Sequence, residues 1–212
     1  MNNADIKTVV FDMYGVIMKD PVAGLMPFVR RHFPDLDMEA IYAPWLRANV
    51  GELSSLEYLR ILGFTGDLSA IQKEYLDTIE IDGDFYGAAE RLKRRFRLAL
   101  LSNDLSEWSR YLREKHGLDG LFDAVVVSGD VKIKKPEPEI FYILLRRLGQ
   151  GASGCVYIDD RKNNLDAAGS LGFDTVLYDN GWKFHDGGKG NIGYAGKVAR
   201  SLPELADMLI YN

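Results

Sequence analysis

The sequence predicts an α/β protein: a Rossmann-like, doubly wound parallel sheet with helices on both faces and a helical insertion near its start. Short apolar runs rich in β-branched residues recur along the chain, and each is apolar at successive positions, as expected for central parallel strands. Segments with the 3.6-residue spacing of amphipathic helices lie between these runs. Between about residues 19 and 81 only helical patterns occur, which indicates a separate helical insertion.

The strands and helices of the sheet domain alternate along the chain. The predicted strands cover residues 8–11, 97–101, 124–127, 155–158 and 175–178. The predicted helices cover residues 86–96, 107–115, 139–148 and 164–171. Right-handed crossovers between parallel strands then place a ligand crevice at the carboxyl ends of the strands, near the point where the strand order reverses.

The insertion contains four helical patterns, over residues 25–33, 38–50, 54–62 and 68–79. Start and stop signals such as Gly51, Ser54 and the Gly66-Asp67 pair separate them. We therefore expect a core domain formed by residues 1–18 and 82–212 and a helical cap domain formed by residues 19–81. Within the insertion, the stripe formed by Trp45, Tyr58 and Leu62 is expected to be core, with the alternative that one of its aromatic residues faces the crevice. Arg47 and Asn49 are possible specificity residues.

Composition excludes several classes of protein. The chain has 212 residues, of which 47% are hydrophobic and 27% charged, and these values are typical of a folded globular protein rather than a disordered one. A net charge of −5 argues against binding to nucleic acid or to an anionic membrane surface. The single cysteine, Cys155, is expected to pack in a strand, and the Gly-rich stretch at residues 186–190 to be a loop. We expect a cytoplasmic monomer or homodimer.

Polar side chains gather where the predicted strands end. These residues are Asp12, the Ser102-Asn103-Asp104 segment, the Lys134-Lys135 pair and the Asp159-Asp160 pair. Carboxylates crowded in one crevice need a cation, and their hard oxygen ligands suit Mg²⁺. Such an ion, with a lysine and hydroxyl or amide donors, would hold a phosphoryl group beside Asp12. The pattern therefore predicts a phosphoryl-transfer site in which Asp12 attacks and an aspartyl-phosphate forms.

Four segments in this order resemble the motifs of the haloacid dehalogenase-like superfamily. They are the nine residues 9–17 (VVFDMYGVI), residues 100–103 (LLSN), residues 135–141 (KPEPEIF) and residues 156–160 (VYIDD) with Asn164 following. The insertion lies where this family carries a helical cap, and the segment around residues 45–57 resembles the cap of the subgroup that contains small sugar phosphatases. Each motif alone is weak, whereas four in order after apolar strands are specific.

The resemblance implies roles for individual residues. It makes Asp12 the nucleophile and the backbone carbonyl of Tyr14 a metal ligand, so Asp12, Tyr14 and Lys135 are assigned to catalysis. Ser102 and Asn103, together with Lys135, would bind the phosphoryl group of a small phosphorylated metabolite. Asp160 would bind Mg²⁺ directly with Asp159 in support, and Asn164 would hold the outer shell of the metal.

Tyr14 departs from the phosphatase pattern, which has a second aspartate at that place as general acid and base. A phenol with a pKa near 10 is a poor base at neutral pH, and a tyrosine here is similar to the 2-haloacid dehalogenases. The acidic pair Asp159-Asp160 favours the metal-dependent phosphatases instead. Three hypotheses remain: a phosphatase, a dehalogenase-like hydrolase, and a low-activity or non-catalytic binding protein. Asp20, Glu52 and water are candidates for the missing acid.

Overall fold

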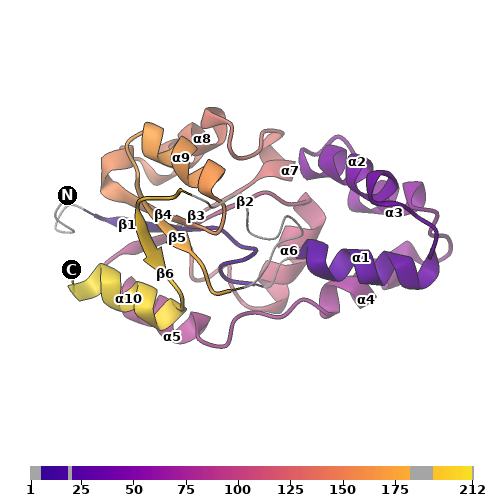
Figure 1. Cartoon of the computed structure of the whole chain (residues 1–212), viewed down its shortest axis with the longest axis horizontal. Coiled ribbons are helices and arrows are strands. Elements are labelled where there is room, and N and C mark those ends of the chain that lie inside the picture. The colour runs from indigo at the N-terminus through magenta and orange to yellow at the C-terminus, as the bar shows by residue number, and fades with distance from the viewer. Residues whose placement is uncertain (1–5, 19–20, 182–192, 212) are drawn as a thin grey trace.

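The computed structural model describes residues 6–18, 21–181 and 193–211, and it has the predicted fold (Figure 1). A six-stranded, all-parallel sheet has the order β3-β2-β1-β4-β5-β6. Its strands are β1 (Thr8–Phe11), β2 (Arg97–Ser102), β3 (Ala124–Val127), β4 (Cys155–Asp159), β5 (Asp174–Tyr178) and β6 (Lys197–Ala199). The order reverses between β1 and β4, so the crevice expected at a topological switch point lies beside the end of β1.

Helices cover both faces of this sheet, and a group of four more lies to one side of it (Figure 1). The helices of the sheet region are α5 (Phe85–Lys93), α6 (Ser106–Lys115), α7 (Ser128–Val131), α8 (Pro138–Leu148), α9 (Lys162–Ser170) and α10 (Leu202–Tyr211). The group to one side consists of α1 (Pro21–His32), α2 (Met38–Asn49), α3 (Ser55–Ile61) and α4 (Leu68–Asp77), which we call the helical insert.

Alternate side chains of the buried strands build two separate parts of the core. On β1, Val9 and Phe11 belong to the larger part, which includes buried residues of α5, α10 and the helical insert. Val10, between them, belongs to the smaller part with residues of α8 and α9. Both faces of the strand are therefore buried, and this explains why its sequence is apolar without alternation.

The helical insert has clear local signals at its helix starts. Asp37 caps α2 by accepting a hydrogen bond from the Ala40 N–H at 2.7 Å. Ser54 and Glu57 form a reciprocal capping box at the start of α3. These contacts satisfy N–H groups that have no partner within the helix, so the sequence fixes where each helix begins.

The structure differs from the sequence prediction mainly at element ends and near the C-terminus. Helix α1 begins at Pro21 and ends at His32, although the predicted span was 25–33. Strand β6 and helix α10 were not predicted. No helix in the described part of the chain is long and apolar enough to cross a membrane. The Gly-rich stretch at residues 186–190 and Asp20 lie outside the described residues.

Candidate active site

Asp12 lies at the end of β1, where the chain leaves the sheet in a tight turn. Its N–H still donates to the Ile158 carbonyl of β4 at 2.9 Å, so the strand geometry fixes its backbone. Its Oδ1 accepts a hydrogen bond from the Met13 N–H at 2.7 Å. In the turn, Gly15 has φ +80°, and a Cβ there would lie 1.9 Å from Oδ2 of Asp160. Only glycine therefore lets the turn pass so close to the acidic pair.

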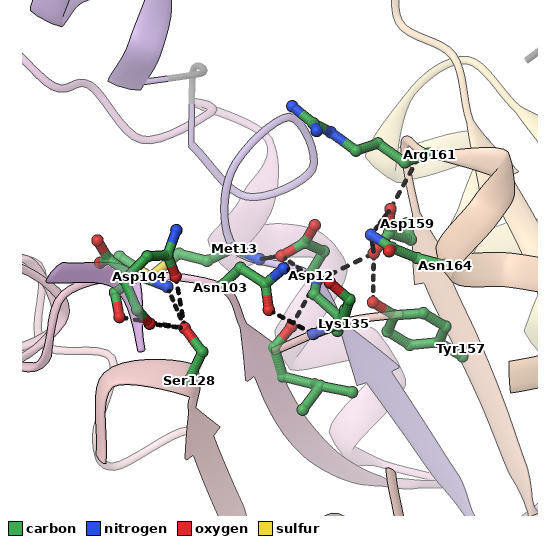
Figure 2. A network of polar contacts seen from close by, with 12 residues as sticks. Asp12, Met13, Asn103, Asp104, Ser128, Lys135, Tyr157, Asp159, Arg161 and Asn164 are labelled. Carbon is green, nitrogen blue, oxygen red and sulfur yellow. Dashed lines mark hydrogen bonds and ion pairs between the residues drawn. The ribbon is translucent and has the colours of Figure 1, made fainter. Parts of the chain in front are cut away.

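Lys135 reaches from the segment before α8 into the space between two carboxylates. Its Nζ lies 2.8 Å from Oδ1 of Asp12 and 3.0 Å from Oδ2 of Asp159, and it donates to the Leu101 carbonyl at 2.9 Å (Figure 2). The Lys135 side chain is 1% exposed. A buried ammonium is stable only with such partners, so Lys135 ties together the ends of β1, β2 and β4.

Asp159, the last residue of β4, is surrounded by donors from the protein (Figure 2). Besides Lys135, the Tyr157 hydroxyl donates to its Oδ2, and the Arg161 N–H donates to its Oδ1 at 2.8 Å. The Asn164 amide donates to both oxygens, at 3.1 and 3.0 Å. Asn164 thus holds the Asp159 carboxylate through its amide nitrogen.

The carboxylates of Asp12, Asp159 and Asp160 form a buried acidic group whose oxygens lie within 4.8 Å of one another. Burial raises the pKa of Asp12 to about 7. The ammonium of Lys135 opposes this rise, and repulsion from Asp159 adds to it. Burial and repulsion from the other two carboxylates hold the pKa of Asp160 well above its usual range. Burial also disfavours ionised Asp159, but Lys135, Tyr157 and the backbone outweigh it and lower its pKa. The protein therefore compensates the charge of Asp159 better than that of Asp12 or Asp160.

The acidic group fits a divalent cation. When all three carboxylates are ionised, one ammonium leaves two negative charges uncompensated, which is the charge that Mg²⁺ would balance. The side-chain ligand atoms that Asp12, Asp159 and Asp160 provide are all carboxylate oxygens, which are hard ligands of the kind that Mg²⁺ prefers. Because Asp159 has its oxygens taken up by protein donors, Asp12 and Asp160 are the better placed direct ligands.

The two residues predicted to bind phosphoryl oxygens lie in different surroundings. The Asn103 amide makes a two-way bridge to the backbone of Lys135, accepting from its N–H at 2.8 Å and donating to its carbonyl at 2.9 Å. Asn103 also lines the cavity beside Asp12. Ser102 is fully buried, and its Oγ has no hydrogen-bond partner among the described residues. Asn103 therefore positions Lys135, a role that its motif alone did not indicate.

The Tyr14 hydroxyl donates to Oδ2 of Asp104 at 2.8 Å. Asp104 is 1% exposed, and its Oδ1 accepts from the Leu105 N–H at 2.8 Å. Burial raises the pKa of Asp104 to about 8, although both hydrogen bonds oppose the shift. Sequence analysis placed Asp104 at a strand end without a role. Its pairing with a residue 90 positions away has no local sequence signal.

A cavity of about 220 Å³ opens above Asp12 and Asp160. On the side of the sheet, its wall includes Tyr14, Lys134, Lys135 and Asn164. On the other side, its wall comes from α2 of the helical insert and includes Tyr42, Trp45, Leu46 and Asn49.

The residues that line the cavity can be compared with those predicted for the helical insert. Trp45 was expected to be core but lies half-buried on the cavity wall, whereas Tyr58 is fully buried as predicted. Asn49 lines the cavity, while Arg47 is exposed and is not on its wall. Glu52, a candidate acid, pairs with Arg47 at 3.1 Å on the surface rather than facing the cavity.

The sequence matches the family model for haloacid dehalogenase-like hydrolases over residues 6–172. This match includes the end of β1, the Lys135 segment and the acidic pair of the site described above. The chain therefore belongs to the haloacid dehalogenase-like hydrolases.

Curated relatives are similar over parts of their length. The chain is 27% identical over 194 residues to acyl-CoA dehydrogenase family member 10 of Mus musculus, a match covering 82% of this chain and 18% of the mouse protein. It is 31% identical over 83 residues to phosphorylated carbohydrates phosphatase of Thermotoga maritima, covering 39% of this chain and 38% of the phosphatase. The match spans less than two thirds of the length of either relative.

Solved structures share the fold at low sequence identity. A HAD-family enzyme from Bacteroides thetaiotaomicron aligns with a TM-score of 0.74 at 20% identity, covering 85% of this chain and 97% of that chain. Its complex with magnesium and inorganic phosphate aligns with a TM-score of 0.68 at 18% identity, covering 85% and 98%. The L-2-haloacid dehalogenase from Xanthobacter autotrophicus aligns with a TM-score of 0.69 at 19% identity, covering 96% and 98%.

Proposed function

We propose that the protein is a Mg²⁺-dependent phosphatase that hydrolyses small phosphomonoesters, with sugar phosphates as the preferred class, through an aspartyl-phosphate on Asp12. The observation that carries this proposal is the buried group of three carboxylates whose charge a single lysine only partly balances. The similarity to a phosphatase of phosphorylated carbohydrates supports the substrate class.

The geometry at Asp12 distinguishes its two oxygens. Oδ1 is held by the Lys135 ammonium at 2.8 Å and by the Met13 N–H at 2.7 Å. Neither of these two donors reaches Oδ2. Oδ2 is therefore the oxygen that attacks phosphorus, because Oδ1 is fixed and its charge is already shared with donors.

The reaction has two steps at this carboxylate. In the first, Asp12 Oδ2 forms a bond to phosphorus while the bond from phosphorus to the leaving oxygen breaks, and the leaving oxygen takes a proton from water. In the second, water attacks phosphorus while the bond from phosphorus to Asp12 Oδ2 breaks, and the proton that this water loses neutralises the hydroxide left by the first step, so that inorganic phosphate leaves and the carboxylate is restored. Bound Mg²⁺ would supply charge compensation that lets an anionic phosphoryl group approach Asp12. Lys135 holds Asp12 in place and adds positive charge beside the phosphoryl oxygens.

The helical insert supports the assignment of a cap. We propose that residues 19–81 form a cap domain of the kind found in small sugar phosphatases and that residues 1–18 and 82–212 form the core domain. Helix α2 supplies one wall of the cavity above Asp12, so the insert can shield the reaction from bulk water. A small phosphorylated metabolite is the expected partner.

Phosphate release from sugar phosphates and p-nitrophenyl phosphate, with Mg²⁺ or with EDTA, tests the proposal, and Asp12→Asn serves as the blank. We expect release that needs both Mg²⁺ and Asp12, with Asp12→Asn folded but inactive because it keeps the side-chain volume and loses the nucleophile. Halide release from 2-haloacids in EDTA would instead establish the dehalogenase-like function that Tyr14 suggests. Turnover by Asp12→Asn near that of the unaltered protein would refute the aspartyl-phosphate mechanism.

A further inference from the structure

One face of α2 forms the wall of the cavity opposite the acidic group. The residues on this wall, Tyr42, Trp45, Leu46 and Asn49, have the spacing i, i+3, i+4 and i+7. This spacing places all four on a single side of a helix. Arg47 lies off this face and is exposed. Helix α2 thus presents a defined surface, mostly apolar and aromatic, to whatever is bound at Asp12.

The two aromatic rings on this face pack against each other. The rings of Tyr42 and Trp45 are stacked, with centroids 5.4 Å apart and an angle of 21° between their planes. Both side chains are half-buried. They therefore offer apolar area that a bound molecule can cover.

The C-terminal end of α2 is fixed to the sheet region, so the aromatic surface has a set position relative to Asp12. The Ser128 Oγ lies 2.6 Å from both the backbone carbonyl and the Oδ1 of Asn49, and it accepts from the Asp104 N–H at 2.9 Å. At Gly51, a Cβ would lie 2.3 Å from the carbonyl oxygen of Gly129. This close, buried contact holds the surface in place before a ligand binds, which lowers the entropic cost of binding.

The two ends of the cavity thus differ in chemistry. The end at Asp12 and Lys135 suits a phosphoryl group, whereas the α2 end suits a flat group with an apolar face. A sugar ring has such a face of C–H groups, which carry partial positive charge and are attracted to the negative face of an aromatic ring. The volume of about 220 Å³ is below the roughly 300–1,000 Å³ of pockets for drug-sized ligands, so the cavity favours a small leaving group such as a single ring.

We propose that Tyr42 and Trp45 form the leaving-group subsite and select phosphomonoesters whose leaving group is one ring over acyclic ones. This inference rests on the proposed phosphatase function and adds to it the residues and the shape that decide the substrate. A cyclic leaving group covers the stacked rings when its phosphoryl group is at Asp12, whereas a short acyclic group leaves them uncovered.

Two substrates test this selection without differing in intrinsic reactivity. Glucose 6-phosphate and glycerol 3-phosphate are both esters of a primary alcohol, so their leaving oxygens have similar pKa values. We expect kcat/KM to favour the cyclic substrate. Trp45→Ala should lower kcat/KM for glucose 6-phosphate about tenfold and for glycerol 3-phosphate less than twofold. Trp45→Phe, which keeps a ring, should fall between Trp45→Ala and the unaltered protein.

Arg47→Ala is the matched control, because Arg47 is on the same helix but exposed and outside the cavity wall. It should leave kcat/KM for both substrates unchanged. An equal loss for both substrates in Trp45→Ala, or no loss for either, would overturn the subsite while leaving the phosphatase function standing.

A binding measurement separates the two proposals if the unaltered protein hydrolyses neither ester. That result would refute the phosphatase function, and titration of tryptophan fluorescence with each ester in the presence of Mg²⁺ would then test the subsite alone. We expect glucose 6-phosphate to change the fluorescence at concentrations about tenfold lower than glycerol 3-phosphate, with the change lost in Trp45→Phe. Equal affinity for the two esters, or binding of neither, would refute the subsite.

Discussion

Replacing Lys135 by methionine removes the only cation that the structure places between two buried carboxylates of the described acidic group. Its Nζ lies 2.8 Å from Asp12 Oδ1 and 3.0 Å from Asp159 Oδ2, and its side chain is 1% exposed. The side chains of these partners are 10% and 0% exposed, so both carboxylates are largely removed from bulk water. Breaking a buried ion pair by removing one partner costs about 3–5 kcal/mol. Methionine keeps most of the volume, so the loss comes from charge rather than from a cavity.

Protonation limits this loss and makes it depend on pH. The pKa of Asp12 is raised to about 7 even with Lys135 present, and removing the ammonium raises it further. The folded state then holds a proton on Asp12 that the unfolded chain releases near pH 4, so stability falls as pH rises through neutrality. We expect Lys135→Met to cost about 3 kcal/mol at pH 8 and less at pH 6.

Urea unfolding of the metal-free protein in EDTA, followed by circular dichroism at both pH values, measures this loss. A loss of about 3 kcal/mol corresponds to a Tm lower by roughly 6–12 °C in a chain of this size. Lys134→Met is the matched control, because Lys134 also lines the cavity but makes no ion pair recorded within the described part of the chain. If Lys135→Met stays within about 1 kcal/mol of the unaltered protein at pH 8, the charge balance argued for the site is wrong.

Three further predictions follow from the contacts of the site. Asp160→Asn should raise the Mg²⁺ concentration needed for half-maximal binding in calorimetry by at least about tenfold, and an unchanged titration would argue against a ligand role. Asp104→Asn should gain stability relative to the unaltered protein between pH 5 and pH 8, by up to about 1.4 kcal/mol per pH unit. The pKa of Asp104 is raised to about 8, so the folded unaltered protein holds a proton over this range that its unfolded chain has released, and its stability falls as the pH rises. Unfolding free energies of the two proteins that change in parallel with pH would contradict this prediction. The Tyr14 hydroxyl donates to Asp104, so no strong acid at this position can protonate the leaving oxygen. A substrate with a good leaving group should therefore react faster, and we expect kcat for p-nitrophenyl phosphate to be at least about tenfold higher than kcat for glucose 6-phosphate. Equal kcat values would point to an acid elsewhere.

The sequence predicted the central sheet well because its strands are buried on both faces. Val9, Val10 and Phe11 all have to be apolar, so a short continuous apolar run identifies β1. Strand β6 has only three residues, one of them exposed, and such a short edge strand has little pattern to detect. Helix α10 does have a signal, since Leu202, Leu205, Ala206 and Leu209 follow helical spacing, and this signal was overlooked.

The site was predictable where residues follow strand ends and was not where distant segments meet. Asp12 and the acidic pair follow apolar strands, so their convergence follows from parallel topology. Asn49 and Ser128 are 79 residues apart, and nothing local in either segment indicates their contact. Trp45 was assigned to the core because apolar spacing does not distinguish a helix face that packs in a core from one that lines a cavity.

Tyr14 and the acidic pair suggested opposite functions in the sequence, and the structure shows how both can occur in one site. The Tyr14 hydroxyl is directed to Asp104, which β2 and the segment after it position, and not to the acidic group. Its carbonyl is backbone, so replacing aspartate by tyrosine at this place need not remove a metal ligand. Tyr14 therefore leaves the acidic group of Asp12, Asp159 and Asp160 intact, and burial with mutual repulsion still disfavours ionised Asp12 and Asp160, an effect that a bound cation would relieve. A metal-dependent reaction without a strong acid at this position is consistent with the contacts described here. In a metal-free dehalogenase, protons on these carboxyls would have to relieve the repulsion, and a protonated Asp12 is a poor nucleophile.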